Sequence, residues 1–230
     1  FEQLLSIKVD PGRLPSVLGP GPQELIAGDV RAGYFGTLPS DSLITQTALN
    51  TAHNIVRGTA YGDSDWMKFI LDGKIFFISL RTNRVNISKS GIVEGIGKTG
   101  KTIKIGELTY LHRCIRGDTK DPSNLTTGTF FPSDKTEAGK GVNGSEWGRL
   151  MVNICSDPAL GLPGTWAQFT KADLGMVAAT ASGANTVCYE DSLTVDSVLS
   201  AGGGNGVLQR TLTGAASANW IGHRNVLVLQ

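Results

Sequence analysis

The chain has 230 residues, of which 40% are hydrophobic, and its 21 basic and 20 acidic residues leave a formal net charge of +1. This balance gives no electrostatic case for a nucleic-acid partner or an anionic membrane, and no stretch approaches the roughly 20 apolar residues that span a bilayer. The 30 glycines and the scarcity of long helical patterns favour a loop-rich α+β fold with antiparallel hairpins and two short helices.

Residues 1–23 contain Pro11, Pro15, Pro20 and Pro22, with glycines between them. Proline fixes its own backbone and pushes the preceding residue toward extended conformations. We interpret this region as an extended arm or linker that docks to a sister subunit or a larger assembly. Residues 24–230 are expected to form one compact α+β domain, with a candidate sub-boundary near residues 117–144.

Residues 42–56 are predicted to form a helix, because apolar residues recur there at partly helical spacing and Ser40 or Asp41 can cap its start. His53 falls on this helix. A single helical histidine is more often a hydrogen-bonded or solvent-facing side chain than a ligand, so we assign it no function.

Two hairpins are predicted next. The strands 66–71 and 74–80 are joined by Asp72-Gly73, a dipeptide that tolerates the positive φ angles of a tight turn. The strands 101–105 and 108–115 are joined by Gly106-Glu107, and the alternation over residues 102–105 indicates one wet face. The apolar side chains of the first hairpin are expected to form a core.

Residues 117–144 are rich in Asp, Ser, Thr, Gly and Lys and predict a long polar loop. Asp118, Asp121 and Asp134 are candidate binding-loop residues, since calcium prefers oxygen ligands on loops. Their spacing is not that of an EF-hand, so we prefer a solvated loop that holds no metal.

A second helix is predicted to begin near Ser145, with Asn143 or Ser145 as its cap. One apolar stripe at positions i, i+3, i+4 and i+7 supports it, and it consists of Trp147, Leu150, Met151 and Ile154. Trp147 and Trp166 are expected in the core. Residues 180–220 are expected to be irregular, with short strands.

The last segment contains an apolar strand, Val226 to Leu229, whose side chains alternate to both faces without a polar residue. Such a strand must be buried in a sheet. Trp220, Gly222 and Arg224 are predicted to form a structural core clamp that closes the domain, because a guanidinium carries five donors in a fixed fork. The alternative is an arginine that binds a ligand.

No catalytic constellation is evident in the sequence. There is no GxSxG elbow, and residues 95–102, which resemble a phosphate loop, are not followed by a predicted helix, so we interpret them as the approach to a hairpin. Cys114, Cys155 and Cys188 form no CxxC pair and are expected to be buried free thiols, with one long-range disulfide as the alternative. We therefore expect neither an enzyme nor a cofactor.

Several segments carry a resemblance. The segment Gly222-His223-Arg224-Asn225-Val226-Leu227 resembles the Gly-Tyr-Arg-Pro-Val-Leu close of many bacteriophage virion proteins, with His223 replacing the aromatic residue and Asn225 the proline. It is also similar to the close of the C-type-lectin-like and formylglycine-generating-enzyme folds. Further segments are similar, in the same order, to parts of phage structural proteins: residues 25–29, 33–36, 66–77, 101–106, 145–151 and 165–175.

This resemblance covers roughly residues 24–230 and implies a virion structural protein with a C-type-lectin-like C-terminal part. The expected place is a phage tail, tail fibre, baseplate or neck, with a contribution to host attachment. The implied partners are other virion proteins, sister copies in an oligomer such as a trimer, and a host surface glycan or receptor. The alternatives are a carbohydrate- or receptor-binding module, whose candidate surfaces are residues 117–144 and 180–219, and an enzyme that degrades cell-surface polymers.

Overall fold

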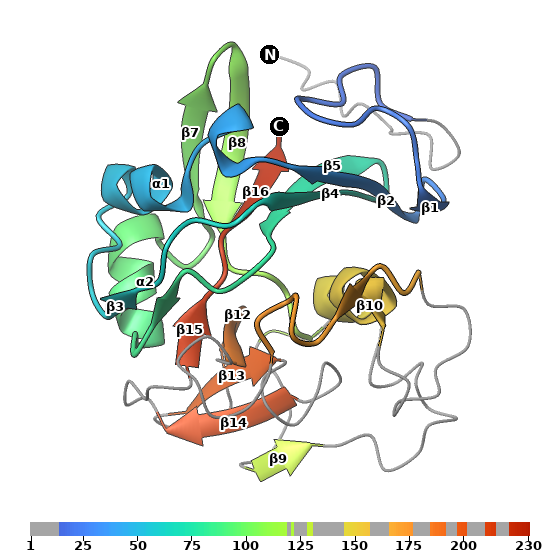
Figure 1. The fold of residues 1–230 in the computed structure, drawn as a ribbon. Helices are drawn as coiled ribbons and strands as arrows, with labels where there is room; N and C mark the ends of the chain where they lie inside the picture. Colours follow the sequence, from blue (N-terminus) through green and yellow to red (C-terminus); the bar gives the residue numbers. More distant parts are fainter. Residues whose placement is uncertain are drawn as a thin grey trace, which may run out of the picture.

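The structure is a computed structural model that describes residues 14–118, 121, 128–130, 145–156, 166–176, 185–191, 197–201, 210–214 and 221–230. Within these ranges the chain forms two large sheets, a short two-stranded sheet and a few short helical segments. It is therefore a mixed, sheet-rich α+β protein, as the sequence predicts. In Figure 1 one large sheet occupies the upper half of the view and the other lies below it.

The upper sheet, sheet A, has antiparallel pairing between all its neighbouring strands within the described residues. Its strands, in order across the sheet, are β1 (Ala27–Gly28), β2 (Ala32–Leu38), β4 (Trp66–Leu71), β5 (Lys74–Ser79), β16 (Val226–Leu229), β8 (Leu108–Arg113) and β7 (Lys101–Ile105). Both predicted hairpins, β4–β5 and β7–β8, are confirmed. Asp72 and Gly73 have φ angles of 48° and 76°, the geometry that an Asp-Gly turn favours.

Both faces of sheet A are covered, which explains why its central strands lack polar alternation. One face contributes Met67, Phe69, Phe76, Ile78, Val226 and Val228 to a core cluster, and the other contributes Trp66, Ile70, Ile75, Phe77 and Leu227 to a second cluster. The prediction that the last strand is buried in a sheet is confirmed, since β16 lies between β5 and β8 and its first three residues are at most 3% exposed.

The helical segments are short. A 3₁₀ turn, η1 (Ser40–Ser42), precedes α1 (Gln46–Ala52), whose first turn is capped by the Thr45 hydroxyl accepting from the Ala48 N–H at 3.1 Å. The helix predicted over 42–56 is therefore wrong at both ends, and Asn54, with a φ of 55°, has already left the helical conformation. Within the described ranges, no helix is long and apolar enough to cross a bilayer.

Helix α2 (Lys89–Ile96) is not predicted from the pattern, because Gly91 and Gly95 lower its helix propensity. Ser88 caps it by accepting from the Gly91 N–H at 3.2 Å. Gly95 is required for packing, since a Cβ there would lie 2.4 Å from the carbonyl oxygen of His53. The missing side chain lets α2 approach the segment that follows α1.

The helix predicted near Ser145 is present, and the Ser145 hydroxyl accepts from the Gly148 N–H at 3.1 Å. Its centre is the π-helical segment η3 (Trp147–Val152), which differs from the expected α-helix in its wider turns. Trp147, Leu150 and Met151 are at most 1% exposed and belong to the core cluster on one face of sheet A.

The lower sheet, sheet B, has the order β3 (Thr59–Ala60), β6 (Arg84–Val85), β15 (Ile221–His223), β12 (Asn185–Asp191), β13 (Ser197–Ala201), β14 (Arg210–Gly214) and β9 (Gly128–Phe130). Strands β12 and β15 are parallel, and the other described neighbours are antiparallel. A third, small sheet pairs β10 (Cys155–Ser156) with β11 (Phe169–Thr170) in parallel.

One expectation is wrong for the described residues of sheet B. The short strands expected within residues 180–220 are present as β12, β13 and β14, but β9 lies inside the region 117–144 that was expected to be loop. Strand β9 has the short sequence Gly-Thr-Phe, so hydrophobic periodicity does not mark it. Pairing with β14, which is distant in sequence, decides its conformation.

The chain crosses between the two sheets several times, and two of these crossings are at most four residues long. Residues 80–83 lead from β5 to β6, and Arg224-Asn225 leads from β15 to β16. Figure 1 shows the second crossing as the red segment that runs from the lower sheet into the upper one, with α1 and α2 beside the junction. Since β5 and β16 pair in sheet A and β6 and β15 pair in sheet B, the two crossings lie side by side.

The described part of the expected arm, residues 14–23, packs against its own domain. Leu14 and Leu18 contact the second core cluster of sheet A. Lys68, which is fully buried in β4, donates to the Pro22 carbonyl at 2.6 Å and to the Gly19 carbonyl at 3.4 Å. The expected docking to another subunit also concerns residues 1–13, which lie outside the described residues.

Candidate functional site

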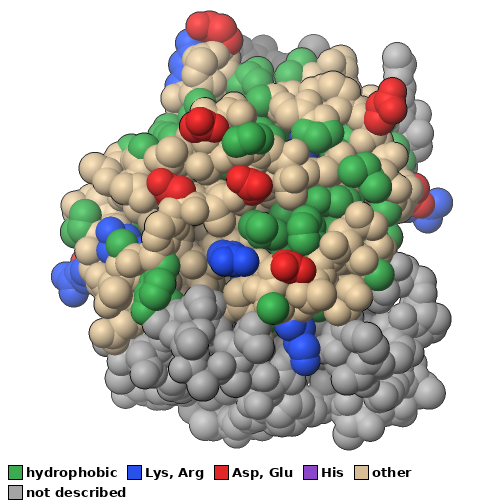
Figure 2. All heavy atoms as spheres, viewed as in Figure 1, with side chains coloured by type: hydrophobic (Ala, Val, Ile, Leu, Met, Phe, Trp, Pro, Cys, Tyr) green, Lys and Arg blue, Asp and Glu red, His purple; other side chains and the backbone are tan. Residues whose placement is uncertain are grey.

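Charge is dispersed over much of the surface. On the face in Figure 2, acidic and basic side chains lie singly among polar and apolar ones. A different arrangement occurs at a pocket of about 350 Å³ beside β5, β8 and β16. Phe76, Leu111 and Val228 give it apolar walls, and its polar lining consists of Lys74, Thr99, Arg113, Arg116, Glu146 and Gln230.

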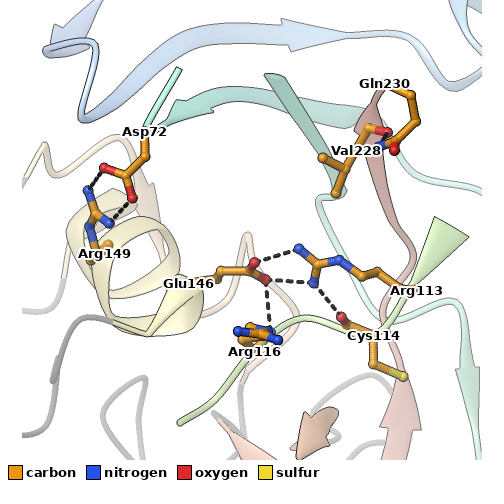
Figure 3. A network of polar contacts seen from close by, with 8 residues as sticks. All are labelled: Asp72, Arg113, Cys114, Arg116, Glu146, Arg149, Val228 and Gln230. Atoms are coloured by element: carbon orange, nitrogen blue, oxygen red, sulfur yellow. Dashed lines mark hydrogen bonds and ion pairs between the residues drawn. The ribbon is translucent and has the colours of Figure 1, made fainter. Parts of the chain in front are cut away.

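A bidentate ion pair between Arg113 and Glu146 forms part of the lining of this pocket (Figure 3). Arg113 Nη1 and Nη2 donate to Glu146 Oε2 and Oε1 at 2.8 and 2.5 Å, and Nη1 also donates to the Cys114 carbonyl at 2.8 Å. The Arg116 backbone N–H donates to Glu146 Oε2 at 3.0 Å. Both charged side chains are only 11% exposed, so each needs the other as its counter-charge.

A second arginine, Arg149 of η3, holds the β4–β5 turn. Arg149 donates to the two Asp72 carboxylate oxygens at 2.5 and 2.7 Å and to the Arg31 carbonyl at 2.5 Å. Hydrogen bonding from Arg149 lowers the pKa of Asp72. The short segment 146–150 therefore fastens both β8 and the β4–β5 hairpin to the core.

Lys74 and Arg116 are the cationic side chains at the more exposed part of the pocket. With Arg113 they give three cations against the one carboxylate of Glu146. A basic lining beside apolar walls suits an anionic group carried on a partly apolar ring, such as an acidic sugar. None of these pocket residues was singled out from the sequence, because they come from segments far apart in the chain.

The predicted clamp residue Arg224 lies in the interior and is 1% exposed. It donates to the carbonyls of Ser79, at 2.8 Å, of Leu80, and of Leu174, at 2.7 Å. Burial lowers the pKa of Arg224 to about 9. Gly222 lies in β15, paired with Val85 on one side and Thr186 on the other, and Trp220 lies outside the described residues.

The candidate loop carboxylates have different surroundings. Asp118 is 4% exposed, so the expectation that it lies on a solvated loop is wrong. The bridge between Ile115 and Cys188 holds the preceding stretch inside the fold. Asp121 pairs with Lys98 at 3.1 Å, and Asp134 lies outside the described residues. In the part of the chain that is described, no group of three or more His, Cys, Asp or Glu is arranged to hold a metal ion.

A buried polar cluster at the junction of the two sheets is the feature that the sequence does not reveal. The histidine cluster comprises His53, His112, His223, Asn50, Asn83 and Asn225, all at most 4% exposed. It contains the three histidines of the whole chain. His53 was expected to be a hydrogen-bonded or solvent-facing side chain on a helix; it follows the end of α1, is buried and makes a hydrogen bond.

Direct contacts join these residues. The Nδ1 atoms of His53 and His112 are 2.8 Å apart, and His112 Nε2 lies 2.8 Å from Asn225 Oδ1. Asn83 Oδ1 accepts from the amide groups of Asn225, at 3.2 Å, and Asn50, at 3.1 Å. The rings of His112 and His223 have centroids 5.7 Å apart. Sequence spacing gives no signal for this cluster, since the packing of distant strands, connections and the end of α1 brings its members together.

The segment that resembles a phosphate loop does fit the Gly-x4-Gly-Lys-Thr spacing, over Gly95 to Thr102. A phosphate loop connects a strand to the N-terminus of a helix. Here the order is reversed, because the segment connects the end of α2 to the start of β7. The backbone amides of a helix N-terminus are therefore not available to a phosphate at this place.

Cys114, Cys155 and Cys188 are buried, and none of them forms a disulfide, which confirms the expectation of free thiols. Comparison of the chain with known protein families, with curated proteins and with solved structures found no match.

Proposed function

We propose that the chain is a structural component of a bacteriophage particle, located in a tail, fibre, baseplate or neck appendage. One observation carries the proposal: segments similar to those of phage virion proteins follow one another in the same order from residue 25 to residue 227. Each segment is short, so their shared order is the main support.

The position of these segments in the fold supports a structural role for them. Residues 33–36 lie in β2, residues 66–77 form most of the β4–β5 hairpin, and β16 pairs with β5. Polar residues within the segments hold the fold together, as Glu146 does with Arg113 and Arg149 with Asp72. Side chains used in this way fit a scaffold better than a catalytic centre.

The C-type-lectin-like part of the proposal is supported by the region around β16. Such a fold closes on a Gly-aromatic-Arg strand that seals its core. In this chain Arg224 is buried against carbonyls from two other segments, immediately before a strand at the centre of sheet A. The arginine of this motif therefore has hydrogen-bond partners inside the fold.

The test of the virion proposal is mass spectrometry of purified, intact phage particles from a lysate that expresses the chain. We expect its peptides at a constant ratio to a known particle protein through successive density gradients. A non-structural protein from the same lysate is the control, and its ratio should fall with each gradient. Loss of the chain in parallel with that control would exclude a place in the particle.

A second function, binding of a host surface glycan or receptor, is favoured by the pocket at Arg113 and Glu146. Its three cationic side chains and apolar walls suit carboxylated or phosphorylated sugars. Trp147 is 1% exposed and Trp166 packs near Phe69, with ring centroids 6.2 Å apart. Neither indole is therefore well placed to stack on a sugar, and the pocket is the better candidate.

This second function is testable on a glycan array that contains acidic glycans and their neutral counterparts. We expect selective retention of acidic glycans and its loss in a Lys74→Gln, Arg116→Gln double variant. An Arg57→Gln, Lys104→Gln double variant, which loses the same number of charges outside the pocket, should leave retention unchanged. Equal retention of acidic and neutral glycans, or equal effects of the two sets of variants, would contradict a role for this pocket.

A further inference from the structure

We propose that the histidine cluster is an acid-sensitive latch between sheets A and B, closed while its imidazoles are neutral and opened when they take up protons. The proposal goes beyond a place in a phage particle and does not depend on it. It is based on where the three histidines lie, how they contact one another, and which charges surround them.

The cluster spans the junction of the sheets. His112 belongs to β8 of sheet A, and His223 belongs to β15 of sheet B. Asn83 and Asn225 lie in the two short crossings described above, and the Asn83 N–H donates to the His223 carbonyl at 3.1 Å. A change in the cluster therefore acts on both crossings and on both sheets.

The contact between His53 and His112 requires at least one of the two rings to be neutral. A neutral imidazole has one N–H donor and one acceptor nitrogen, so a single proton can occupy the 2.8 Å space between the Nδ1 atoms of His53 and His112. If both rings were imidazolium, two N–H groups would point at each other across this distance. Among the described residues, neither ring nitrogen of His223 has a partner of normal hydrogen-bond geometry, although the nearby Asn225 side chain favours the charged ring.

The charged groups around the cluster are cationic. Lys101 of β7 lies opposite His112 in the strand register, and Arg84 of β6 lies opposite His223. On the other side of residue 53, Glu94 of α2 forms an exposed ion pair with Arg57. The neighbouring titratable thiol, Cys114, is buried in an apolar group with isoleucines. The arginines next in sequence are engaged elsewhere, Arg113 with Glu146 and Arg224 with carbonyls.

Burial lowers the pKa of each histidine below its usual 6.5. Burial lowers the pKa of His223 to about 4, against an opposing hydrogen bond from the Asn225 side chain, and Arg84 adds a smaller lowering effect. Burial, then His223 and His53, hold the pKa of His112 well below 6.5, while the hydrogen bond with the Asn225 side chain opposes them. For His53, burial and Lys101 lower the pKa, while a hydrogen bond to the Thr102 backbone opposes them.

The direction of the pH effect follows from these shifts. Unfolded histidines take up protons as the pH falls through about 6.5, while His223 stays neutral until the pH approaches its folded pKa of about 4, and the pKa values of His112 and His53 are also lowered. The latch therefore stabilises the fold fully above pH 6.5 and weakens as the pH falls, for His223 down to about pH 4. In this window the unfolding equilibrium constant should rise about tenfold per pH unit for each histidine that is protonated in the unfolded chain and neutral in the fold.

The first experiment needs no variant. Two-dimensional NMR of the histidine ring protons should show three ring systems, each assigned to one residue. We expect all three to titrate below the usual 6.5, with the pKa of His223 at about 4, or only when the fold opens. A histidine that titrates near pH 6.5 with the fold intact would overturn its assignment to the latch, and two such histidines would overturn the proposal.

The second experiment measures urea unfolding at several pH values between 7.5 and 5. His223→Asn removes one proton-binding group, so its pH dependence below pH 6 should be about tenfold per unit weaker than that of the wild type. The same slope in both proteins would overturn the proposal. If the variant does not fold, His53→Gln serves the same comparison at the edge of the cluster.

Hydrogen exchange locates the opening. At pH 5.5, after correction for the intrinsic pH dependence of exchange, we expect amides in β6 and β15 to lose protection before those in β4 and β5. Simultaneous loss in all four strands, with unchanged histidine titration, would indicate general acid unfolding and contradict a latch at the junction.

Discussion

Two buried polar centres in this protein solve the same problem differently. At the Arg113–Glu146 pair, a cation and a carboxylate with equally low exposure satisfy each other through two hydrogen bonds. In the histidine cluster, three basic rings share contacts with neutral amides, and the nearby charges are Lys101 and Arg84. The side chains of the first centre are buried in their charged forms, whereas the histidines of the second are stable in the interior only in their neutral forms.

The difference decides which conditions each centre tolerates. In the Arg113–Glu146 pair, each charge has its counter-charge within hydrogen-bond distance. The cluster loses its contribution in mildly acidic solution, because its unfolded histidines gain protons there. The pair fastens η3 to β8 within one core, while the cluster joins two sheets, so the pH-sensitive contact lies where the parts of the molecule meet.

The largest effect is expected when the matched pair is broken. Glu146→Gln keeps the shape of the side chain but leaves the Arg113 charge buried without its counter-charge, which should lower the free energy of unfolding by about 3–5 kcal/mol. Urea unfolding at pH 7 measures it. Glu94→Gln is the control, since its pair with Arg57 is exposed and worth at most about 1 kcal/mol. Similar losses of stability in the two variants would show that the buried ion pair contributes no more than the exposed one.

A smaller loss is expected when the support of the histidine cluster is disturbed. In Gly95→Ala, the added Cβ would lie 2.4 Å from the His53 carbonyl oxygen and 2.8 Å from Ile55 Cγ1, so either α2 or the segment after α1 must move. We expect a loss of about 1–3 kcal/mol. Gly62→Ala is the matched control, because no atom lies within 4 Å of its Cβ position. Thermal unfolding of both variants distinguishes the outcomes, and unchanged stability of Gly95→Ala would contradict this packing.

A third test concerns a buried cation that has neutral partners. Lys68 lies over the rings of Phe35 and Phe77 and donates to carbonyls of residues 19 and 22, while burial lowers its pKa to about 8. Lys68→Met should change the free energy of unfolding by about 1 kcal/mol or less, since an apolar side chain fits this site. It should, however, release the arm.

Chymotrypsin cleavage after Leu18 measures the release of the arm and should be faster in Lys68→Met than in the wild type. The wild type should also gain stability between pH 8 and 10.5, because the unfolded lysine keeps a proton that the folded one has lost. This gain should be absent in the variant. Equal cleavage rates would show that Lys68 does not hold the arm.

The smallest effect is expected at the ion pair between Asp72 of the β4–β5 turn and Arg149 of η3. Asp72→Asn preserves a residue type that tolerates the φ of 48° but removes the charge that pairs with Arg149. Because Asp72 is 60% exposed, we expect a loss of about 0.2–1 kcal/mol at pH 7. The pKa of Asp72 is lowered by Arg149, so the wild-type advantage is present above about pH 4 and is lost as the pH falls through the folded pKa. A difference between the two proteins that persists at pH 2 would point to the turn and not the ion pair.

Local patterns in the sequence predicted those elements whose neighbours are close in the chain. Asp72-Gly73 and Gly106-Glu107 mark turns between strands that pair with each other, and the Ser145 cap precedes a helix with one apolar stripe. The unbroken apolar run at β16 indicated a buried strand without identifying its neighbours. In these cases the residues that decide the structure lie within a few positions of it.

The remaining features depend on contacts between distant segments. Gly95 looks like a helix breaker until the His53 carbonyl is seen beside it. Strand β14 has few apolar residues and is held by β13 and β9. The histidine cluster joins residues 53, 112 and 223, and the pocket joins β5, β8, β16 and η3. Neither could be predicted without the register of both sheets.

The placement of β15 and β16 also has a consequence for biosynthesis. These strands come last in the sequence, yet β16 separates β5 from β8 and β15 separates β6 from β12. While the ribosome is still making the earlier residues, sheet A can exist only as two fragments with unpaired edges, and such edges invite aggregation. A message that stopped before residue 220 would therefore leave a chain unable to finish either sheet, so folding of the whole domain must wait for translation to reach these strands.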